Sequence, residues 1–256
     1  MDSLEPTVTA TPAAQAPTSS WPPLKRIAPW WHTALLVAFV LAMSATSSQR
    51  LDVVVSKHGR LAMYFPTIVA EWLMVGYILW GMRKSGTRLR DVIGGRWDSP
   101  EDFLLDFALA IGTWIVVLLM LGLLAWVLGL AREANLEQAK RQIYGLLPQS
   151  GAEIAAWTVL CATAGFCEEL IFRGYLLRQF GASFGTLWLA VVAQAIVFGL
   201  AHGYEGWQRM ILIALEGVVL AALAVWRKSL RPGMGAHFTQ DFVSGMVGRM
   251  AGKLLK

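Results

Sequence analysis

Long runs of apolar residues recur along the chain, and they constrain its fold more than any other feature. A run of about 18 to 20 apolar residues is long enough to cross a bilayer as a helix, and a backbone in lipid must satisfy its own hydrogen bonds. The sequence therefore predicts an all-α fold, a polytopic transmembrane bundle of about six to eight helices. Six runs with few charges carry this prediction: 30–48, 61–82, 100–131, 152–180, 184–202 and 207–226.

The composition agrees with a membrane setting. The chain is 56% hydrophobic and 15% charged, against roughly 25% charged in an ordinary soluble domain, and its mean hydropathy is +0.52. Its net charge of +5 lies in loops between apolar runs, where it sets orientation in the bilayer rather than binding nucleic acid. We expect an integral protein of a bacterial inner or plasma membrane, with membrane lipid as a partner and no nucleic acid. The basic cluster of Lys25, Arg26 and the loop 83–96 places the N-terminus in the cytoplasm.

The chain divides into three parts. Residues 1–24 are rich in Pro, Ala, Thr and Ser and are expected to be a disordered tail, because they lack the apolar surface that would offset the entropy of ordering. Residues 25–151 are expected to form N-terminal transmembrane helices and loops, ending in a polar connector with an amphipathic piece at the interface. Residues 152–250 form the core that carries the chemistry.

Local signals refine these helices. Ser99 followed by Pro100 predicts a capped helix start. The segment after Pro232 and Gly233 is expected to be shorter than the others and, because it is polar, to pack inside the bundle. Cys161 and Cys167 lie on different faces of one predicted helix and are expected to be free, buried thiols.

Two adjacent acids, Glu168 and Glu169, lie inside an apolar run. A charge in hydrocarbon costs about 2.5 kcal/mol or more, so such a pair needs compensation. Arg173 follows Glu169 by four residues and can pair with it on one helix face. Glu168 then points about 100° away and is free to face a cavity.

Two histidines occur in the later apolar segments. His202 follows Phe198 by four residues, and His237 precedes Asp241 by four. A single histidine in such a place is more often a packing residue, but here three successive helices each supply a titratable group. The separations, 34 residues from Glu168 to His202 and 35 from His202 to His237, suit helices that return to a similar depth. We therefore expect these groups to face one another across the bundle interior.

Two more acids fall in apolar runs. Glu71 is either a second functional carboxylate or, as we favour, a structural partner that faces the bundle. Glu216 and Phe198 are candidates for lining a substrate path, although a hydrogen bond between helices is the favoured use of Glu216.

These residue types support hydrolysis. A carboxylate beside an imidazole can hold a water and take its proton, and donors opposite can stabilise an oxyanion. Glu168, His202 and His237 can instead ligate zinc, with one position open to water. Because no HExxH sequence is present, the cofactor prediction stays open between none and one divalent metal such as zinc.

Three short motifs resemble a known family. EELIFRG (from Glu168), FGLAH (to His202) and HFTQD (from His237) resemble, in order and spacing, the EExxxR, FxxxH and HxxxN/D motifs of the CPBP family. Its members are called CAAX proteases, bacteriocin-processing enzymes or intramembrane metalloproteases. The resemblance covers about residues 152–247.

The resemblance implies an integral membrane endopeptidase whose substrate is a membrane-associated peptide or protein, prenylated in some members and linked to peptide maturation or bacteriocin self-immunity in others. It implies that Glu168 and His202 activate water, that Arg173 holds Glu169, and that His237 with Asp241 forms the oxyanion site. Asp241 departs from the asparagine of the prenyl proteases. An aspartate donates a hydrogen bond only when protonated, so this position favours either a protonated Asp241 or a metal-ligand role.

Two other functions remain open. A non-catalytic membrane partner or self-immunity protein would keep the fold without the reaction. A transporter or proton relay would also bury Glu and His, but the acids gather at one site instead of along a path, and paired broken helices are absent from the sequence pattern.

Overall fold

The structure, a computed structural model, describes residues 22–47, 51–129 and 146–254. The predicted tail, apart from residues 22–24, and the amphipathic piece of the connector lie outside these ranges. The all-α prediction is confirmed, since the described residues form helices and no strand. The elements are α1 (Trp30–Ser47), α2 (Leu51–His58), α3 (Leu61–Arg83), α4 (Leu89–Ile93), α5 (Pro100–Val127), α7 (Gly151–Glu168), η1 (Glu169–Leu176), α8 (Leu177–Phe184), α9 (Leu187–Ala201), η2 (Gly203–Glu205), α10 (Trp207–Arg227) and α11 (Arg231–Leu254).

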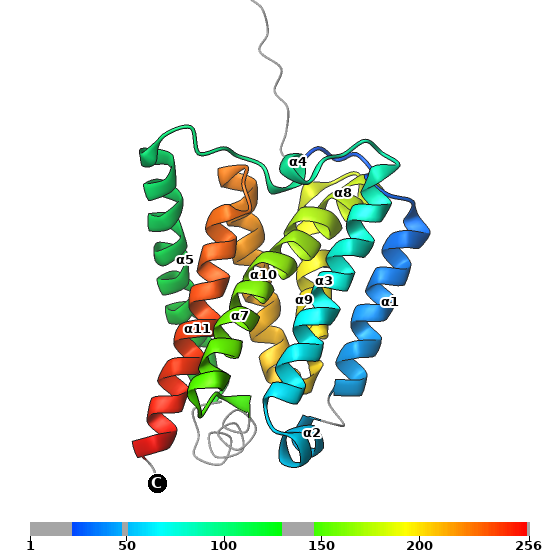
Figure 1. Ribbon diagram of the computed structural model, residues 1–256. Helices are drawn as coiled ribbons and strands as arrows, with labels where there is room; N and C mark the ends of the chain where they lie inside the picture. The colour runs from blue at the N-terminus through cyan, green and yellow to red at the C-terminus, as the bar shows by residue number, and fades with distance from the viewer. Residues whose placement is uncertain (1–21, 48–50, 130–145, 255–256) are drawn as a thin grey trace, which may run out of the picture.

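One long helical rod organises the bundle. It consists of α7, η1 and α8 in direct succession and crosses the centre of the molecule (Figure 1). In this view α1 and α3 lie on one side of it, α5 and α11 on the other, and α9 and α10 behind it. The two helices that lie beside α7, namely α3 and α11, each contact it.

The middle of the rod, η1, is a π-helix, and all eight of its residues are buried. Its apolar side chains join those of α1, α3 and α9 in the main core. A π-helical turn inside an α-helix is rare and occurs frequently at functional sites. The unusual backbone therefore coincides with the segment whose charges the sequence marks as functional.

Within the described residues, four helices are long and apolar enough to cross a membrane: α3, α5, α10 and the rod over Gly151–Phe184. Large apolar side chains of α5 are exposed along its length, including Leu104, Leu119 and Trp126, as expected of a face in lipid. The helix α9 has only 15 residues, or about 22 Å at 1.5 Å per residue, against about 30 Å of hydrocarbon. Its end therefore lies within the depth of the bundle.

Several predicted boundaries differ from the structure. The last segment is not short: α11 has 24 residues, because Pro232 and Gly233 lie in its first turn, where proline is tolerated. The polar stretch before Leu61 contains α2, and the basic loop contains α4. The rod runs on to Phe184 and ends at Gly185, whose φ of 70° is the left-handed conformation that favours glycine. The cap at Ser99 is confirmed, since its side chain accepts a hydrogen bond from the Asp102 amide at 3.3 Å.

Candidate active site

The central rod holds the two adjacent acids. Glu169 and Arg173 form the predicted ion pair, with 2.9 Å between Arg173 Nη1 and Glu169 Oε1 and neither side chain exposed. The Arg173 guanidinium also lies over the Phe198 ring, 4.1 Å from its centroid. Glu168, whose side chain is 16% exposed, is left out of this pair, as the sequence predicts. The buried charge of Glu169 is thus compensated from within the same turn of the rod.

The helix α11 brings His237 against both acids. His237 Nδ1 lies 3.2 Å from Glu169 Oε1, and Nε2 lies 3.7 Å from Glu168 Oε2 and 3.6 Å from Asp241 Oδ2. Two glycines allow this approach. A Cβ at Gly165 would lie 2.9 Å from the Met234 carbonyl oxygen, and a Cβ at Gly233 would lie 3.0 Å from Glu169 Oε2.

His202 lies at the end of α9, half-buried. Its Nδ1 lies 2.9 Å from the Phe198 carbonyl oxygen and donates to it, because a carbonyl can only accept. In a neutral imidazole this leaves Nε2 as an acceptor. The Phe198 ring contacts both imidazoles, with centroids 5.0 Å from His202 and 5.9 Å from His237. The side chains from α7, η1, α9 and α11 therefore gather around one aromatic ring.

The two remaining acids belong to the same cluster. Glu71 of α3 is 5% exposed and interacts electrostatically with Glu168, His237 and Asp241. Glu216 of α10 is 8% exposed and interacts with Arg173, His202, His237 and Asp241. The sequence marked both acids but did not place Glu71 beside the catalytic candidates. Phe198, at 1% exposure, packs inside the cluster; that it or Glu216 lines a substrate path stays a prediction.

Several polar atoms of this cluster have no hydrogen-bond partner among the described residues. They are Oε2 of Glu71, Glu168 and Glu169, and Nε and Nη2 of Arg173. Buried polar groups are normally paired, by protein or by ordered water. The unpaired atoms therefore mark a place built to receive water or polar groups of a ligand.

The donors do not fit the zinc site that the sequence left open. Among the described residues, no group of three His, Cys, Asp or Glu side chains is placed to hold a metal ion. Within the conditional set of Glu168, His202 and His237, Glu168 Oε2 and His237 Nε2 lie 3.7 Å apart, and Nε2 is the nitrogen that His202 could offer a metal, since Nδ1 bonds the Phe198 carbonyl. We therefore derive no step of the chemistry through a metal.

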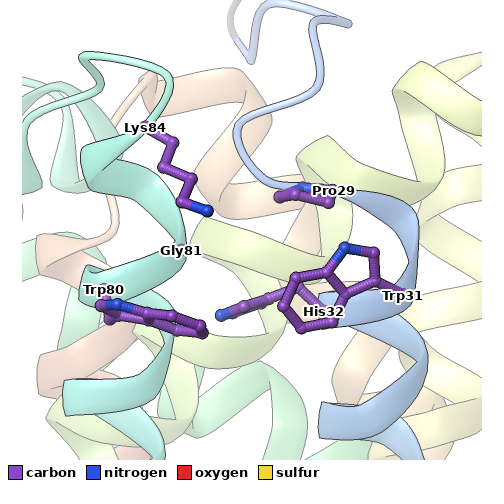
Figure 2. A pocket seen from close by; sticks show the side chains of 6 residues that line it. All are labelled: Pro29, Trp31, His32, Trp80, Gly81 and Lys84. Atoms are coloured by element: carbon purple, nitrogen blue, oxygen red, sulfur yellow. The ribbon is translucent and has the colours of Figure 1, made fainter.

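A hollow elsewhere in the bundle belongs to helix packing. It has about 170 Å³ of empty volume and is lined by Pro29, Trp31, His32, Trp80, Gly81 and Lys84. Figure 2 shows the His32 side chain between Trp31 of α1 and Trp80 of α3. The His32 ring stacks on Tyr77 and hydrogen-bonds Tyr175 at 2.7 Å, in the space that the missing side chain of Gly81 leaves. The hollow contains none of the candidate catalytic residues.

The cysteines are both buried and free, as predicted. Ser44 of α1 is a residue that the sequence did not mark. It bonds to the main chain on either side of His202, and a serine within an apolar helix gives no signal that would have revealed this contact.

Comparison with known proteins gives a family match for part of the chain. Residues 150–243 match the model of the family described as type II CAAX prenyl endopeptidase Rce1-like. No curated protein matches the chain, and no solved structure does. The matched range contains all three motifs and every candidate catalytic residue from Glu168 to Asp241. The resemblance that the motifs carry is therefore confirmed over residues 150–243, where the chain is similar to the Rce1-like type II CAAX prenyl endopeptidases.

Proposed function

We propose that this chain is an intramembrane endopeptidase that hydrolyses a peptide bond of a membrane-associated substrate with water activated by Glu168 and His202. One observation carries the proposal: a membrane-buried cluster joins two adjacent acids, an arginine and two histidines, and several of its oxygens lack partners. Buried ionisable groups in a membrane protein are expensive and by default mark function. The family match supplies the reaction class, a CAAX-type protease.

The residues divide the reaction between them. Glu168 takes a proton from the water as its oxygen attacks the carbonyl carbon, and His202 Nε2, an acceptor in the neutral tautomer, helps to orient that water. Glu168 then delivers the proton to the leaving nitrogen as the C–N bond breaks. Glu169 is not assigned as this base, because its side chain is fully buried and its Oε1 contacts Arg173 and His237.

His237 is proposed to face the oxyanion. Three carboxylates surround its ring, at 3.2 to 3.7 Å, so its doubly protonated form balances their charge and has an Nε2–H to donate. An N–H donor aimed at the developing oxyanion contributes about 10² to 10³ in rate. Arg173, through Glu169, fixes the orientation of this imidazole.

The substrate class follows from the family match. We propose a lipidated peptide with a CaaX-type C-terminus, which its prenyl chain would anchor in the bilayer that surrounds the site. We also infer that the N-terminus faces the cytoplasm, because the loop 83–96 and the turn after α10 meet at one end of the bundle, where the Leu230 amide bonds the Ile93 carbonyl. Basic residues of both segments, and of the segment before α1, gather there.

The test uses the full chain in liposomes with an internally quenched, farnesylated CaaX-type peptide, and mass spectrometry locates the cut. Glu168→Gln keeps the shape of the side chain but removes the base, so we expect at least a 10²-fold loss of kcat. Glu101→Gln, a change at an exposed glutamate in the first turn of α5, is the matched control. A chelator arm tests the metal separately and is expected to leave the rate unchanged.

A second function has one observation in its favour. Asp241 lies 3.6 Å from His237 Nε2 where the prenyl proteases have asparagine, and an ionised aspartate gives the oxyanion no donor. A non-catalytic membrane partner would tolerate this residue. Absence of cleavage of the farnesylated and the unmodified peptide, or equal rates for Glu168→Gln and Glu101→Gln, would refute the peptidase and favour the partner protein.

A further inference from the structure

His202 lies at the position where the main chain leaves the helix α9. The helix α9 ends at Ala201, and His202 has the non-helical angles φ −101° and ψ 23°. A helix end leaves amides and carbonyls without their usual partners. Inside a membrane bundle, such irregular backbone persists only where the protein or a water-filled cavity satisfies it.

A side chain of α1 bonds to this helix end. Ser44 Oγ donates to the Leu200 carbonyl oxygen at 2.8 Å and accepts from the Gly203 amide at 3.0 Å. Ser44 is 7% exposed, so these bonds form away from the surface. The hydroxyl therefore fastens the chain on both sides of His202, two residues before it and one residue after it.

The contact between Ser44 and Gly203 is close. A Cβ at Gly203 would lie 2.9 Å from Ser44 Oγ, which is closer than real Cβ atoms approach. The imidazole is held separately, by the bond from Nδ1 to the Phe198 carbonyl. Its orientation is thus fixed within α9, while the position of its backbone is fixed from α1.

We propose that Ser44 is a positioning residue for His202, holding the imidazole where it can orient the attacking water. The proposal rests on the proposed function for its effect on rate, but not for the contact itself. It extends the site beyond residues 150–243, which match the family model, to the first membrane helix. It makes α1 part of the catalytic machinery as well as of the core.

The same helix offers a matched control. Thr46 also carries a hydroxyl, but it bonds the Ala42 and Met43 carbonyls of its own helix, both at 3.0 Å, and is exposed. Thr46→Ala therefore removes a hydroxyl from α1 without touching α9. Ser44→Thr keeps a hydroxyl at the clamp and serves as the conservative rescue.

Two measurements on the full chain in liposomes test the proposal. Hydrogen exchange at the Gly203 amide should become about five-fold faster in Ser44→Ala, since a hydrogen bond worth about 1 kcal/mol is lost, and should not change in Thr46→Ala. With the farnesylated peptide, kcat should fall about 10- to 100-fold in Ser44→Ala, because a displacement of about 1 Å can cost 10²-fold. KM should stay within about two-fold, and Ser44→Thr should recover most of kcat.

The outcomes separate the clamp from the proposed function. Unchanged Gly203 exchange in Ser44→Ala would overturn the clamp, whatever the activity. Faster exchange with kcat equal to that of Thr46→Ala would overturn the positioning role. Faster exchange with no hydrolysis by the unsubstituted chain would overturn the proposed peptidase function and keep the contact.

Discussion

The contact between α7 and α11 at Gly165 gives the sharpest prediction. A Cβ at this position would lie 2.9 Å from the Met234 carbonyl oxygen and 3.0 Å from the Phe238 amide nitrogen. Ordinary van der Waals contact begins near 3.4 Å, so in Gly165→Ala the backbone of α11 must move by about 0.5 Å (3.4 − 2.9). Both contacts are with backbone atoms, which cannot rotate away. Overpacking of this kind costs about 1 to 3 kcal/mol.

The displacement falls on His237, which lies one turn from Met234 and is the proposed oxyanion donor. Misplacement by about 1 Å can cost 10²-fold in rate, so a shift of half that size should lower kcat by about ten-fold. Thermal unfolding in detergent should show a lower midpoint for Gly165→Ala. Gly112→Ala in α5, where a new Cβ meets nothing within 4 Å, should hold or raise the midpoint, because alanine favours a helix over glycine by about 1 kcal/mol. Equal midpoints and equal kcat for the two variants would refute the argument that backbone contact sets the place of His237.

Two further predictions concern the ion pair and the orientation. Arg173→Met removes the arginine that pairs with the buried Glu169 and leaves His237 as the remaining cation beside it. Removing one partner of a buried pair costs about 3 to 5 kcal/mol, so the thermal midpoint should drop sharply, and Glu169→Gln in the same chain should restore part of it. No drop in the single variant would contradict the assigned pairing. Cys161 and Cys167 are buried, so Asp98→Cys and Lys57→Cys each give the protein one exposed thiol, at opposite ends of the bundle. An impermeant maleimide added to intact cells should label only Lys57→Cys. Labelling of Asp98→Cys alone would place the N-terminus outside the cell.

The parts of the site that depend on local spacing could be predicted from the sequence. Glu169 and Arg173 lie four residues apart on one rod, so their pairing follows from helix geometry alone. The meeting of Glu168 with His237, 69 residues later in the chain (237 − 168), was predictable for another reason. Lipid makes isolated charges expensive, which forces polar groups from different helices to face one another.

Other parts leave no mark in the sequence. The π-helical turn of η1 has the same apolar pattern as an α-helix. Gly165 and Gly233 reveal close approach only when the opposing backbone is known. Ser44 could not be found, because its hydroxyl serves main-chain atoms more than 150 residues away. The length of α11 was mispredicted since Pro232 looks like a helix breaker until it is seen in a first turn.

The glycine contact between α7 and α11 also bears on how a peptide reaches the site. At Gly165 the backbones of α7 and α11 are in contact, so a peptide cannot pass between these two helices at that point. The carboxylate of Asp241, one turn beyond His237, is still 36% exposed. Among the three carboxylates around His237, that of Asp241 is therefore the most open to the surroundings, and Asp241 is also the residue that departs from the prenyl-protease pattern.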